Sequence, residues 1–312
     1  MKLNKPKFWD NKKISFLSII LLPLTIFIII NNFILNRISK EKSKQIKTIC
    51  VGNIYVGGTG KTPLTIKLYN IFKNLDYKVS TAKKFYKNHL DEQILLSNKT
   101  NSIISNTRHE ALKEAINKKN QILIFDDGLQ DKKIDYDLKF VCFNSKLWIG
   151  NGHLIPSGPL REKISSLKKF NAVFLNGNNQ NISKIKKFIY QINPEIEIFE
   201  TFYKPTNIEQ ISLSSKFLVF SGIGNSNSLK ETLMENNIKI VEEIIFPDHY
   251  DYNKNDIEKI KSQAKKINAN IITTEKDYVK IAQLDNKEIN YLEISLEIKN
   301  EDRLIELIKK NI

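Results

Sequence analysis

The chain has 312 residues, enough for two ordinary domains or one large one, and its 41% hydrophobic and 27% charged residues are typical of a folded protein, not a disordered one. Its formal net charge is +15, but 45 of its 49 basic residues are Lys and only four are Arg, the residue on which base recognition depends most. This balance argues against a nucleic-acid partner and favours solvated Lys-rich faces that also attract anionic lipid or phosphate ligands.

An apolar segment near the start, Ile14–Ile30, has 17 uncharged residues, of which 13 are Ile, Leu or Phe. As a helix it would be about 26 Å long, slightly short of a hydrocarbon core of about 30 Å, and Pro23 would kink it. No small-residue cleavage site follows, which argues against a signal peptide, and hydrophobicity on all sides argues against a buried soluble helix. We therefore expect a membrane anchor that either spans the bilayer or lies embedded in it. Basic residues flank both ends, so they do not fix its orientation.

Strands and helices alternate along the rest of the chain. The expected strands are Ile46–Val51, Tyr77–Thr81, Gln121–Phe125, Leu138–Phe143, Ala172–Leu175, Phe217–Phe220, Ile238–Ile245, Asn270–Thr274 and Tyr291–Ile294. One expected helix follows Gly60, a second covers Asp91–Ser97, and a capping box of Thr107 and Glu110 opens a third over Arg108–Lys118. Cys50 and Cys142 fall in apolar stretches without metal-binding spacing, so we expect buried thiols in a reducing compartment.

The strongest chemical signal is a glycine-rich loop between a strand and a helix, Val51-Gly-Asn-Ile-Tyr-Val-Gly-Gly-Thr-Gly-Lys-Thr62. Glycines let backbone amides curl around phosphate oxygens, and the start of a helix favours negative charge. The residues expected to bind nucleotide phosphate are Gly57, Gly58, Thr59, Gly60, Lys61 and Thr62. Lys61 suits the β- and γ-phosphates, and the Thr62 hydroxyl suits Mg²⁺. Tyr55 replaces the first glycine of the strict phosphate-loop pattern, but strand, loop and helix together still predict nucleotide binding.

Two carboxylates, Asp126 and Asp127, follow a compact apolar strand. Alone they would indicate an ordinary turn, but beside a phosphate loop they predict a Mg²⁺ site. A phosphate loop does not by itself separate a kinase from a switch GTPase or another ATPase. A GTPase would carry an Asn/Thr-Lys-x-Asp motif, and in Thr274-Glu-Lys-Asp277 the Lys is one place late, which disfavours the switch.

These features predict an α/β fold, with a P-loop NTPase-like, mostly parallel sheet flanked by helices, a second smaller α/β domain and an N-terminal membrane helix. We expect residues 1–40 to form the anchor and its basic flanks, 41–205 the nucleotide-binding kinase domain and 206–312 the smaller domain. The last helix is a candidate to pack back on the first domain.

Further motifs occur in a fixed order from residue 5 to about residue 280. Besides the phosphate loop with Pro63 they are Lys5-Pro-Lys-Phe-Trp9, Asp91-Glu92, Asp126-Asp-Gly-Leu-Gln130, Gly150-Asn-Gly-His-Leu-Ile-Pro-Ser-Gly-Pro-Leu-Arg-Glu162, Ser221-Gly-Ile-Gly-Asn225, Phe246-Pro-Asp-His249 and Thr274-Glu-Lys-Asp277. With these motifs the sequence resembles the tetraacyldisaccharide 4′-kinase family of lipid A biosynthesis, over most of the chain.

The resemblance implies an enzyme, an ATP-dependent lipid-sugar kinase that moves the ATP γ-phosphoryl to the 4′-hydroxyl of a tetraacyl glucosamine disaccharide 1-phosphate. It implies that Asp91 is the catalytic carboxylate and that His249 is its orienting or proton-sharing partner. The ligands that it implies for Mg²⁺ are Thr62, Asp126, Asp127 and Glu162, and the residues beside the ATP are Gln130 and Arg161.

The implied partners are the acylated disaccharide lipid and the inner-membrane bilayer, with the catalytic domain facing the cytosol and no obligate protein partner. The alternatives are a membrane-docked P-loop switch or partitioning ATPase and a degenerate family member without turnover. One segment departs from the family: Ala82-Lys-Lys-Phe-Tyr-Lys-Asn-His-Leu-Asp91 is shortened and lacks the Arg and Gly of a Ser-Arg-Gly-Tyr-Gly-like loop. Lys84 and Tyr86 are the expected stand-ins for the Arg and the Tyr, so the departure bears on acceptor binding.

Overall fold

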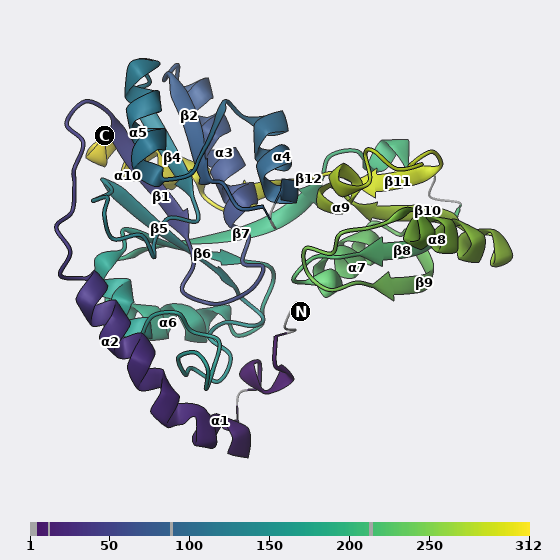
Figure 1. Ribbon diagram of the computed structural model, residues 1–312, viewed down its shortest axis with the longest axis horizontal. Helices are drawn as coiled ribbons and strands as arrows, with labels where there is room; N and C mark the ends of the chain where they lie inside the picture. Colours follow the sequence, from purple (N-terminus) through teal and green to yellow (C-terminus); the bar gives the residue numbers. More distant parts are fainter. Residues whose placement is uncertain (1–4, 12, 88–89, 212–214) are drawn as a thin grey trace.

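Two bodies, each built on a parallel sheet, make up the computed structural model, which describes residues 5–11, 13–87, 90–211 and 215–312 (Figure 1). The helices are η1 (Lys7–Trp9), α1 (Phe16–Leu21), η2 (Leu22–Leu24), α2 (Thr25–Leu35), α3 (Lys61–Asn74), α4 (Leu90–Lys99), α5 (Arg108–Asn117), η3 (Ile164–Lys169), α6 (Ile182–Ile192), η4 (Ile208–Gln210), α7 (Ser226–Glu235), α8 (Lys254–Lys266), α9 (Glu275–Lys280) and α10 (Glu301–Asn311), where η marks a 3₁₀-helix. The strands are β1 (Lys47–Gly52), β2 (Val79–Lys84), β3 (Ser102–Ser105), β4 (Ile122–Asp126), β5 (Leu138–Asn144), β6 (Ala172–Asn176), β7 (Glu197–Pro205), β8 (Lys216–Ser221), β9 (Lys239–Ile245), β10 (Asn270–Thr274), β11 (Ile289–Leu292) and β12 (Ile294–Ile298).

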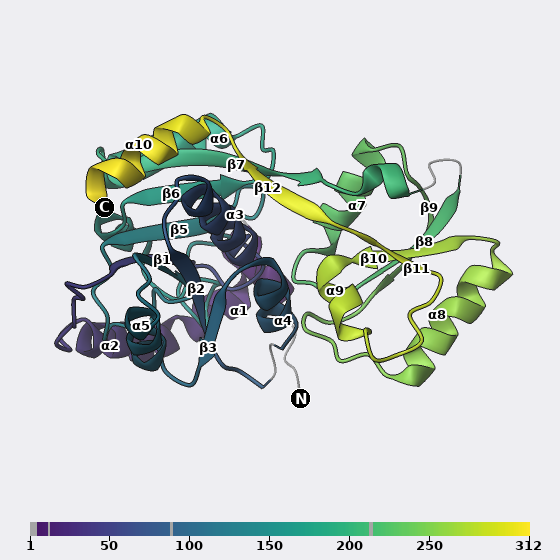
Figure 2. The same cartoon turned by 90° about the horizontal axis from the view of Figure 1, so that it is seen from above.

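The larger sheet has the strand order β12-β7-β6-β5-β1-β4-β2-β3, and within the described chain its strand pairs are parallel except for β12 with β7. Central strands such as β4 and β6 are buried along their whole length, as expected for a parallel sheet covered on both faces. Helices α3 and α10 pack on one face, and α5 and α6 pack on the other. Figure 2 shows β7 and β12 running from the larger body toward the smaller one. The predicted α/β fold with a mostly parallel, helix-flanked sheet is confirmed.

Strand β1 lies between β4 and β5, so the chain leaves it in one direction through α3 and β2 and later returns on its other side. Ligands of open parallel sheets bind at such a reversal of strand order, beyond the carboxyl ends of the strands. The glycine-rich loop follows β1 and Asp127 follows β4, so the fold brings these two predicted elements to the same edge.

Two local predictions about the larger sheet are confirmed. The Thr107 hydroxyl accepts a hydrogen bond from the Glu110 amide (3.2 Å), and the Glu110 carboxylate accepts one from the Thr107 amide (3.1 Å), which is the expected capping box of α5. Cys50 in β1 and Cys142 in β5 are free and buried. Burial raises the pKa of the Cys50 thiol to about 12, so this thiol is unreactive at neutral pH.

The smaller sheet has the strand order β11-β10-β8-β9 and is covered by α7 on one face and α8 on the other. The sequence predicted one strand over Tyr291–Ile294, but the structure divides this segment. Leu292 ends β11 in the smaller sheet, and Ile294 begins β12, which pairs with β7 in the larger one. Residues after Glu293 therefore lie in or against the larger sheet, and Leu304 and Ile308 of α10 pack in the core beside α3.

The N-terminal apolar segment forms an almost continuous helical run, α1–η2–α2. Pro23 lies in the 3₁₀ turn η2, which is the irregularity expected for it. Residues Phe16–Leu35 have a mean hydropathy of 2.3, are long and apolar enough to cross a membrane, and are only 11% buried. Large apolar side chains such as Phe16 (76% exposed) and Phe27 (67%) point away from the body.

The opposite side of this helical run is attached to the body near both ends. Near its start, the Ser157 hydroxyl donates to the Ser18 carbonyl (2.7 Å), and the Asn151 amide donates to the Ser18 hydroxyl (2.9 Å). Near its end, the Asn32 amide donates to the Arg161 carbonyl (2.9 Å). The Gly150–Glu162 segment therefore supplies the residues that hold the apolar helix against the body, a role that its sequence does not reveal.

Candidate active site

The glycine-rich loop joins β1 to α3 and is shaped by its own polar residues. The Asn53 amide donates to the Gly57 carbonyl (3.3 Å) and to the Thr59 hydroxyl (3.2 Å), which curls the loop. Gly60 precedes α3 with a φ of +89°, a left-handed conformation that favours glycine. A Cβ at this position would lie 2.9 Å from the Asn176 amide nitrogen and 3.0 Å from the Tyr203 hydroxyl, so a larger residue would have to displace these side chains.

Gly60→Ala is expected to weaken ATP binding about tenfold or more, because left-handed backbone costs an alanine roughly 1–2 kcal/mol and the new Cβ must also displace its neighbours. Gly177→Ala is the matched control: its φ is +90°, but its added Cβ would meet only the Ser145 hydroxyl at an ordinary 3.6 Å. Calorimetric titration with ATP should show a loss for the first variant only. Equal affinities of the two variants would contradict the role of this loop.

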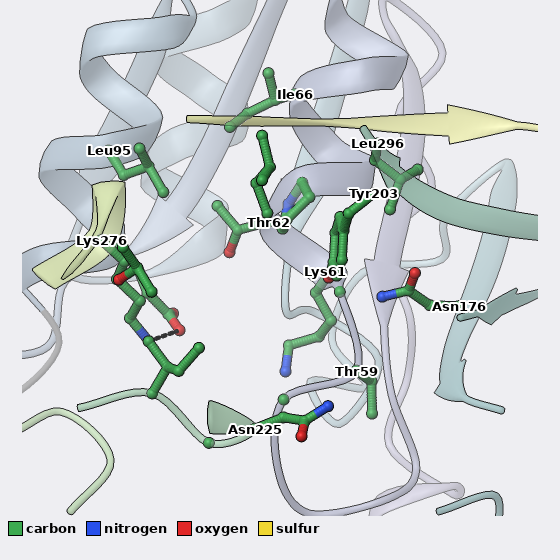
Figure 3. A pocket seen from close by; sticks show the side chains of 18 of the residues that line it. Thr59, Lys61, Thr62, Ile66, Leu95, Asn176, Tyr203, Asn225, Lys276 and Leu296 are labelled. Carbon is green, nitrogen blue, oxygen red and sulfur yellow. Dashed lines mark hydrogen bonds and ion pairs between the residues drawn. The ribbon is translucent and has the colours of Figure 1, made fainter. Parts of the chain in front are cut away.

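A cavity of about 740 Å³ opens between the carboxyl edge of the larger sheet and the smaller body (Figure 3). The larger body contributes all six predicted phosphate-loop residues, together with Lys83, Glu92, Asp126, Asp127 and Arg161. The smaller body contributes Ile223, Gly224, Asn225, His249 and Lys276. Figure 3 shows Lys61 and Thr62 facing the interior, with Asn225 and Lys276 approaching from the other side. The cavity can therefore hold a triphosphate on one wall and a second substrate on the other.

Asp126 and Asp127 lie at the end of β4 on the phosphate-loop wall. The Thr62 hydroxyl donates to Asp126 Oδ2 (2.9 Å), and Lys61 Nζ lies 3.8 Å from Asp127 Oδ2. Burial alone would raise the pKa of Asp127, but the charges of Lys61, Arg161 and Lys83 outweigh it and hold that pKa below its usual range. Asp127 is therefore anionic at neutral pH.

Each of these carboxylates also has one buried oxygen, Oδ1, that accepts no hydrogen bond within the described chain. Buried polar atoms are rarely left so, and an oxygen-preferring cation beside Thr62 would satisfy both. The described residues contain no cluster of three or more His, Cys, Asp or Glu side chains placed to hold a metal. The two carboxylates beside the Thr62 hydroxyl fit Mg²⁺, which usually binds one or two carboxylates and completes its coordination with phosphate oxygens and water.

Lys83 is a site residue that sequence reasoning missed. Its side chain is 4% exposed, and its Nζ lies 2.5 Å from Asp126 Oδ2 and 2.8 Å from Glu92 Oε2. The expected stand-in for the family Arg was Lys84, but that side chain lies over the Tyr86 ring, 5.4 Å from its centroid. Because neighbouring residues of a strand point to opposite faces, only one of the two lysines can enter the site, and it is Lys83.

The predicted catalytic pair is brought together across the two bodies. His249 Nδ1 lies 3.0 Å from Asp91 Oδ2 and 3.1 Å from Oδ1, although the two residues are 158 positions apart. Asp91 is only 5% exposed and does not line the cavity, whereas His249 does. Burial would raise the pKa of Asp91, but the hydrogen bond from His249 and the charges of Lys276 and Lys280 hold it well below the usual range.

The remaining predicted residues are divided by the structure. Arg161 lines the cavity and lies 3.8 Å from Asp127 Oδ1. Gln130 does not line it; its amide donates to the Asn53 carbonyl (2.7 Å), and its side-chain oxygen accepts from Arg161 (3.2 Å), so it positions both. Glu162 is not brought to the phosphate loop. It lies in a separate smaller cavity, bonded to Lys132 (2.8 Å), and the geometry gives no support to its predicted role as a metal ligand.

Comparison with known proteins supplies independent information. Residues 16–312 match the family LpxK, tetraacyldisaccharide-1-P 4′-kinase. A tetraacyldisaccharide 4′-kinase of Pelagibacter ubique is 50% identical over the full length of both chains, and one of Rickettsia typhi is 32% identical over 99% of each. A crystal structure of Aquifex aeolicus LpxK in complex with ATP is similar in fold, with a TM-score of 0.70 and 22% identity over 94% of this chain and 99% of that one. The resemblance predicted from the motifs is confirmed, and the chain belongs to the tetraacyldisaccharide-1-P 4′-kinase family.

Proposed function

We propose that the chain transfers the γ-phosphoryl group of ATP to the 4′-hydroxyl of a tetraacyl glucosamine disaccharide 1-phosphate, a step of lipid A biosynthesis. The observation that carries the proposal is one cavity with two different walls, a phosphate loop with paired carboxylates on one and an Asp91–His249 pair reaching the other. Phosphoryl transfer needs little beyond such positioning and charge stabilisation. Apolar groups at the other end of the cavity, Ile66, Leu296 and the Tyr203 ring, suit the nucleoside of ATP (Figure 3).

His249 is the group that faces the acceptor in this mechanism. Asp91 accepts the Nδ1–H hydrogen bond, which fixes the tautomer and makes Nε2, beside Glu92 Oε1 (3.7 Å) and Asp248 Oδ1 (3.8 Å), the nitrogen that would take the 4′-hydroxyl proton. This assignment exchanges the roles expected from the resemblance, because a carboxylate with a lowered pKa is a weak base and Asp91 does not line the cavity. The acceptor oxygen then bonds to the γ-phosphorus, the bond to the β–γ bridging oxygen breaks, and ADP leaves.

Residues of the phosphate wall hold the transferred group. Lys61 and the backbone amides of Gly57–Thr62 face the triphosphate, and Arg161 adds charge from the side. Bound Mg²⁺ would neutralise negative charge on the phosphate oxygens, and Thr62, Asp126 and Asp127 are the residues that would hold it. Lys83 holds the Asp126 and Glu92 carboxylates in position, and its charge helps to hold the pKa of Glu92 below its usual range.

The proposal is tested by incubating the purified full chain with γ-labelled ATP and the acylated disaccharide 1-phosphate in mixed micelles. We expect label in the lipid fraction, and its loss when Mg²⁺ is chelated. Label released as inorganic phosphate on adding a protein partner would favour a docked ATPase. Binding of ATP without turnover under any condition would identify a degenerate family member.

We also propose that the anchor lies embedded in the cytosolic leaflet of the inner membrane and does not cross it. The helical run bonds to the body at Ser18 near its start and at Asn32 near its end, while its apolar side chains face outward. A helix that is bonded to the body near both of its ends cannot leave the body to span a bilayer. The residues ahead of the run also reach the phosphate loop, since Lys5 and Asp10 both contact the Tyr55 hydroxyl. This arrangement would bring a membrane lipid close to the cavity.

Cysteine labelling tests this topology, because the native thiols Cys50 and Cys142 are buried. An impermeant maleimide is added to cells whose outer membrane has been opened, before and after the inner membrane is lysed. Cysteines replacing Lys7, ahead of the helix, and Lys254, on α8, should both react only after lysis. Reaction of the Lys7→Cys protein before lysis, with Lys254→Cys still protected, would mean that the helix spans the bilayer.

A further inference from the structure

A second cavity, of about 380 Å³, lies where the apolar helical run ends. Four lysines line it, Lys40, Lys132, Lys139 and Lys169, together with Asn36, the residue that follows α2. Its volume is within the range of about 300–1,000 Å³ typical of small-ligand sites. The catalytic cavity shares none of its lining residues, so the ATP and acceptor sites do not account for it.

The charges around this cavity are not balanced. Lys132 is bonded to Glu162 (2.8 Å), Lys139 is bonded to Asp135 (2.8 Å), and Asp131, which also lines the cavity, is paired with Arg108 (3.1 Å). Lys40 makes no ion-pair contact in the described part of the chain, although its charge helps to lower the pKa of Asp135, and Lys169 contacts only the neutral Asn36 side chain (3.3 Å). Two ammonium groups without an ion-pair contact therefore lie at the cavity, which the buried apolar Leu129 and Phe170 also line.

We propose that this lysine-lined cavity binds the phosphate of an anionic phospholipid headgroup, in addition to the catalytic acceptor site. The phosphate would be held by Lys40 and Lys169, and the glycerol end of the headgroup would contact the apolar floor. A membrane lipid is favoured over a free phosphate because Asn36, at the end of α2, lines the site, and the outward side chains of α2 are apolar and exposed. Helix α2 itself lies along the outside of the larger body (Figure 1). The proposal rests on the embedded anchor proposed above and goes beyond the kinase activity.

A physical consequence is that the helix and the lysines act on different parts of the bilayer. Burial of the apolar face does not depend on lipid charge, whereas each lysine near an anionic surface raises affinity about fivefold. Headgroup binding at the end of α2 would also fix how the helix is rotated, and with it the direction in which the catalytic cavity faces. Binding to anionic vesicles is expected to weaken as salt is added.

The test compares Lys40→Gln/Lys169→Gln with Lys254→Gln/Lys259→Gln, a control pair of exposed lysines on α8 with the same change of charge. The full chains are floated with vesicles of phosphatidylcholine alone, or with about one third phosphatidylglycerol. On anionic vesicles we expect the cavity variant to bind about thirtyfold more weakly than wild type and the control variant within about twofold. On phosphatidylcholine all three proteins should bind alike.

Three outcomes would overturn the proposal. The first two are an equal loss of binding to anionic vesicles in both variants, and binding of wild type that does not increase with phosphatidylglycerol. The third is a raised KM for the acceptor on phosphatidylcholine vesicles in the cavity variant alone. The last would mean that the acceptor's own phosphate occupies the cavity. Failure of wild type to bind phosphatidylcholine would instead refute the embedded anchor, and absence of phosphate transfer would refute the kinase, so each failure is distinguishable.

Discussion

His249→Ala is expected to lower kcat by about 10²–10⁴-fold and to leave ATP affinity within about threefold of wild type, because the imidazole serves the acceptor and not the nucleotide. The residue lies across the cavity from the phosphate loop and reaches Asp91 through Nδ1. Steady-state kinetics give kcat, and calorimetric titration gives the ATP affinity. His109→Ala is the matched control, since that histidine, with a half-exposed side chain, pairs with Glu41 away from the cavity.

Asp91→Asn separates the two possible bases. If Asp91 orients His249, Asp91→Asn loses most of its turnover. The kcat of the double variant Asp91→Asn/His249→Ala should then be little lower than that of either single variant, because the two residues act as a unit. Added imidazole should then restore part of the activity of His249→Ala. Rescue of Asp91→Ala by a small carboxylate, without rescue of His249→Ala by imidazole, would make Asp91 the base. Collapse of ATP affinity with unchanged turnover per bound complex would contradict either catalytic role.

Lys61→Ala is expected to lower kcat/KM for Mg·ATP by about 10²–10³-fold, because its ammonium group supplies charge where the triphosphate is handled. The same change removes positive charge beside the Asp127 carboxylate, since Lys61 is the largest of the charges that lower the pKa of Asp127. Lys73→Ala is the control: it removes the same charge from an exposed position in the last turn of α3. Steady-state kinetics of Lys61→Ala that match those of Lys73→Ala would undermine the phosphate-loop assignment.

Features encoded within a short stretch of chain were predictable from the sequence. The strand, glycine-rich loop and helix around Lys61 each require particular residues at neighbouring positions, and so does the capping box of α5. The burial of Cys50 and Cys142 follows in the same way from their apolar neighbours. The pairing of Asp91 with His249 was available only through the resemblance, because the two residues belong to different bodies and 158 positions separate them.

Features that depend on how distant segments meet were not predictable. A single residue, Glu293, separates two strands of different sheets, and nothing in the local pattern marks the change. Whether Lys83 or Lys84 faces the site depends on the register of β2 against β4, which fixes the direction of every side chain. Glu162 stands beside Arg161 in sequence, but the two side chains enter different cavities. The bonds that hold the apolar helix to the body come from Ser157 and Arg161, far along the chain.

The position of the new phosphate on the lipid product tests the central claim most directly. After incubation of the full chain with Mg·ATP and the tetraacyl disaccharide 1-phosphate, the product is analysed by correlated ³¹P and ¹H NMR. The account predicts a second phosphomonoester coupled to the proton on the 4′ carbon, with one ADP formed for each lipid modified. A phosphate on another hydroxyl, or ADP and orthophosphate with the lipid unchanged, would contradict it.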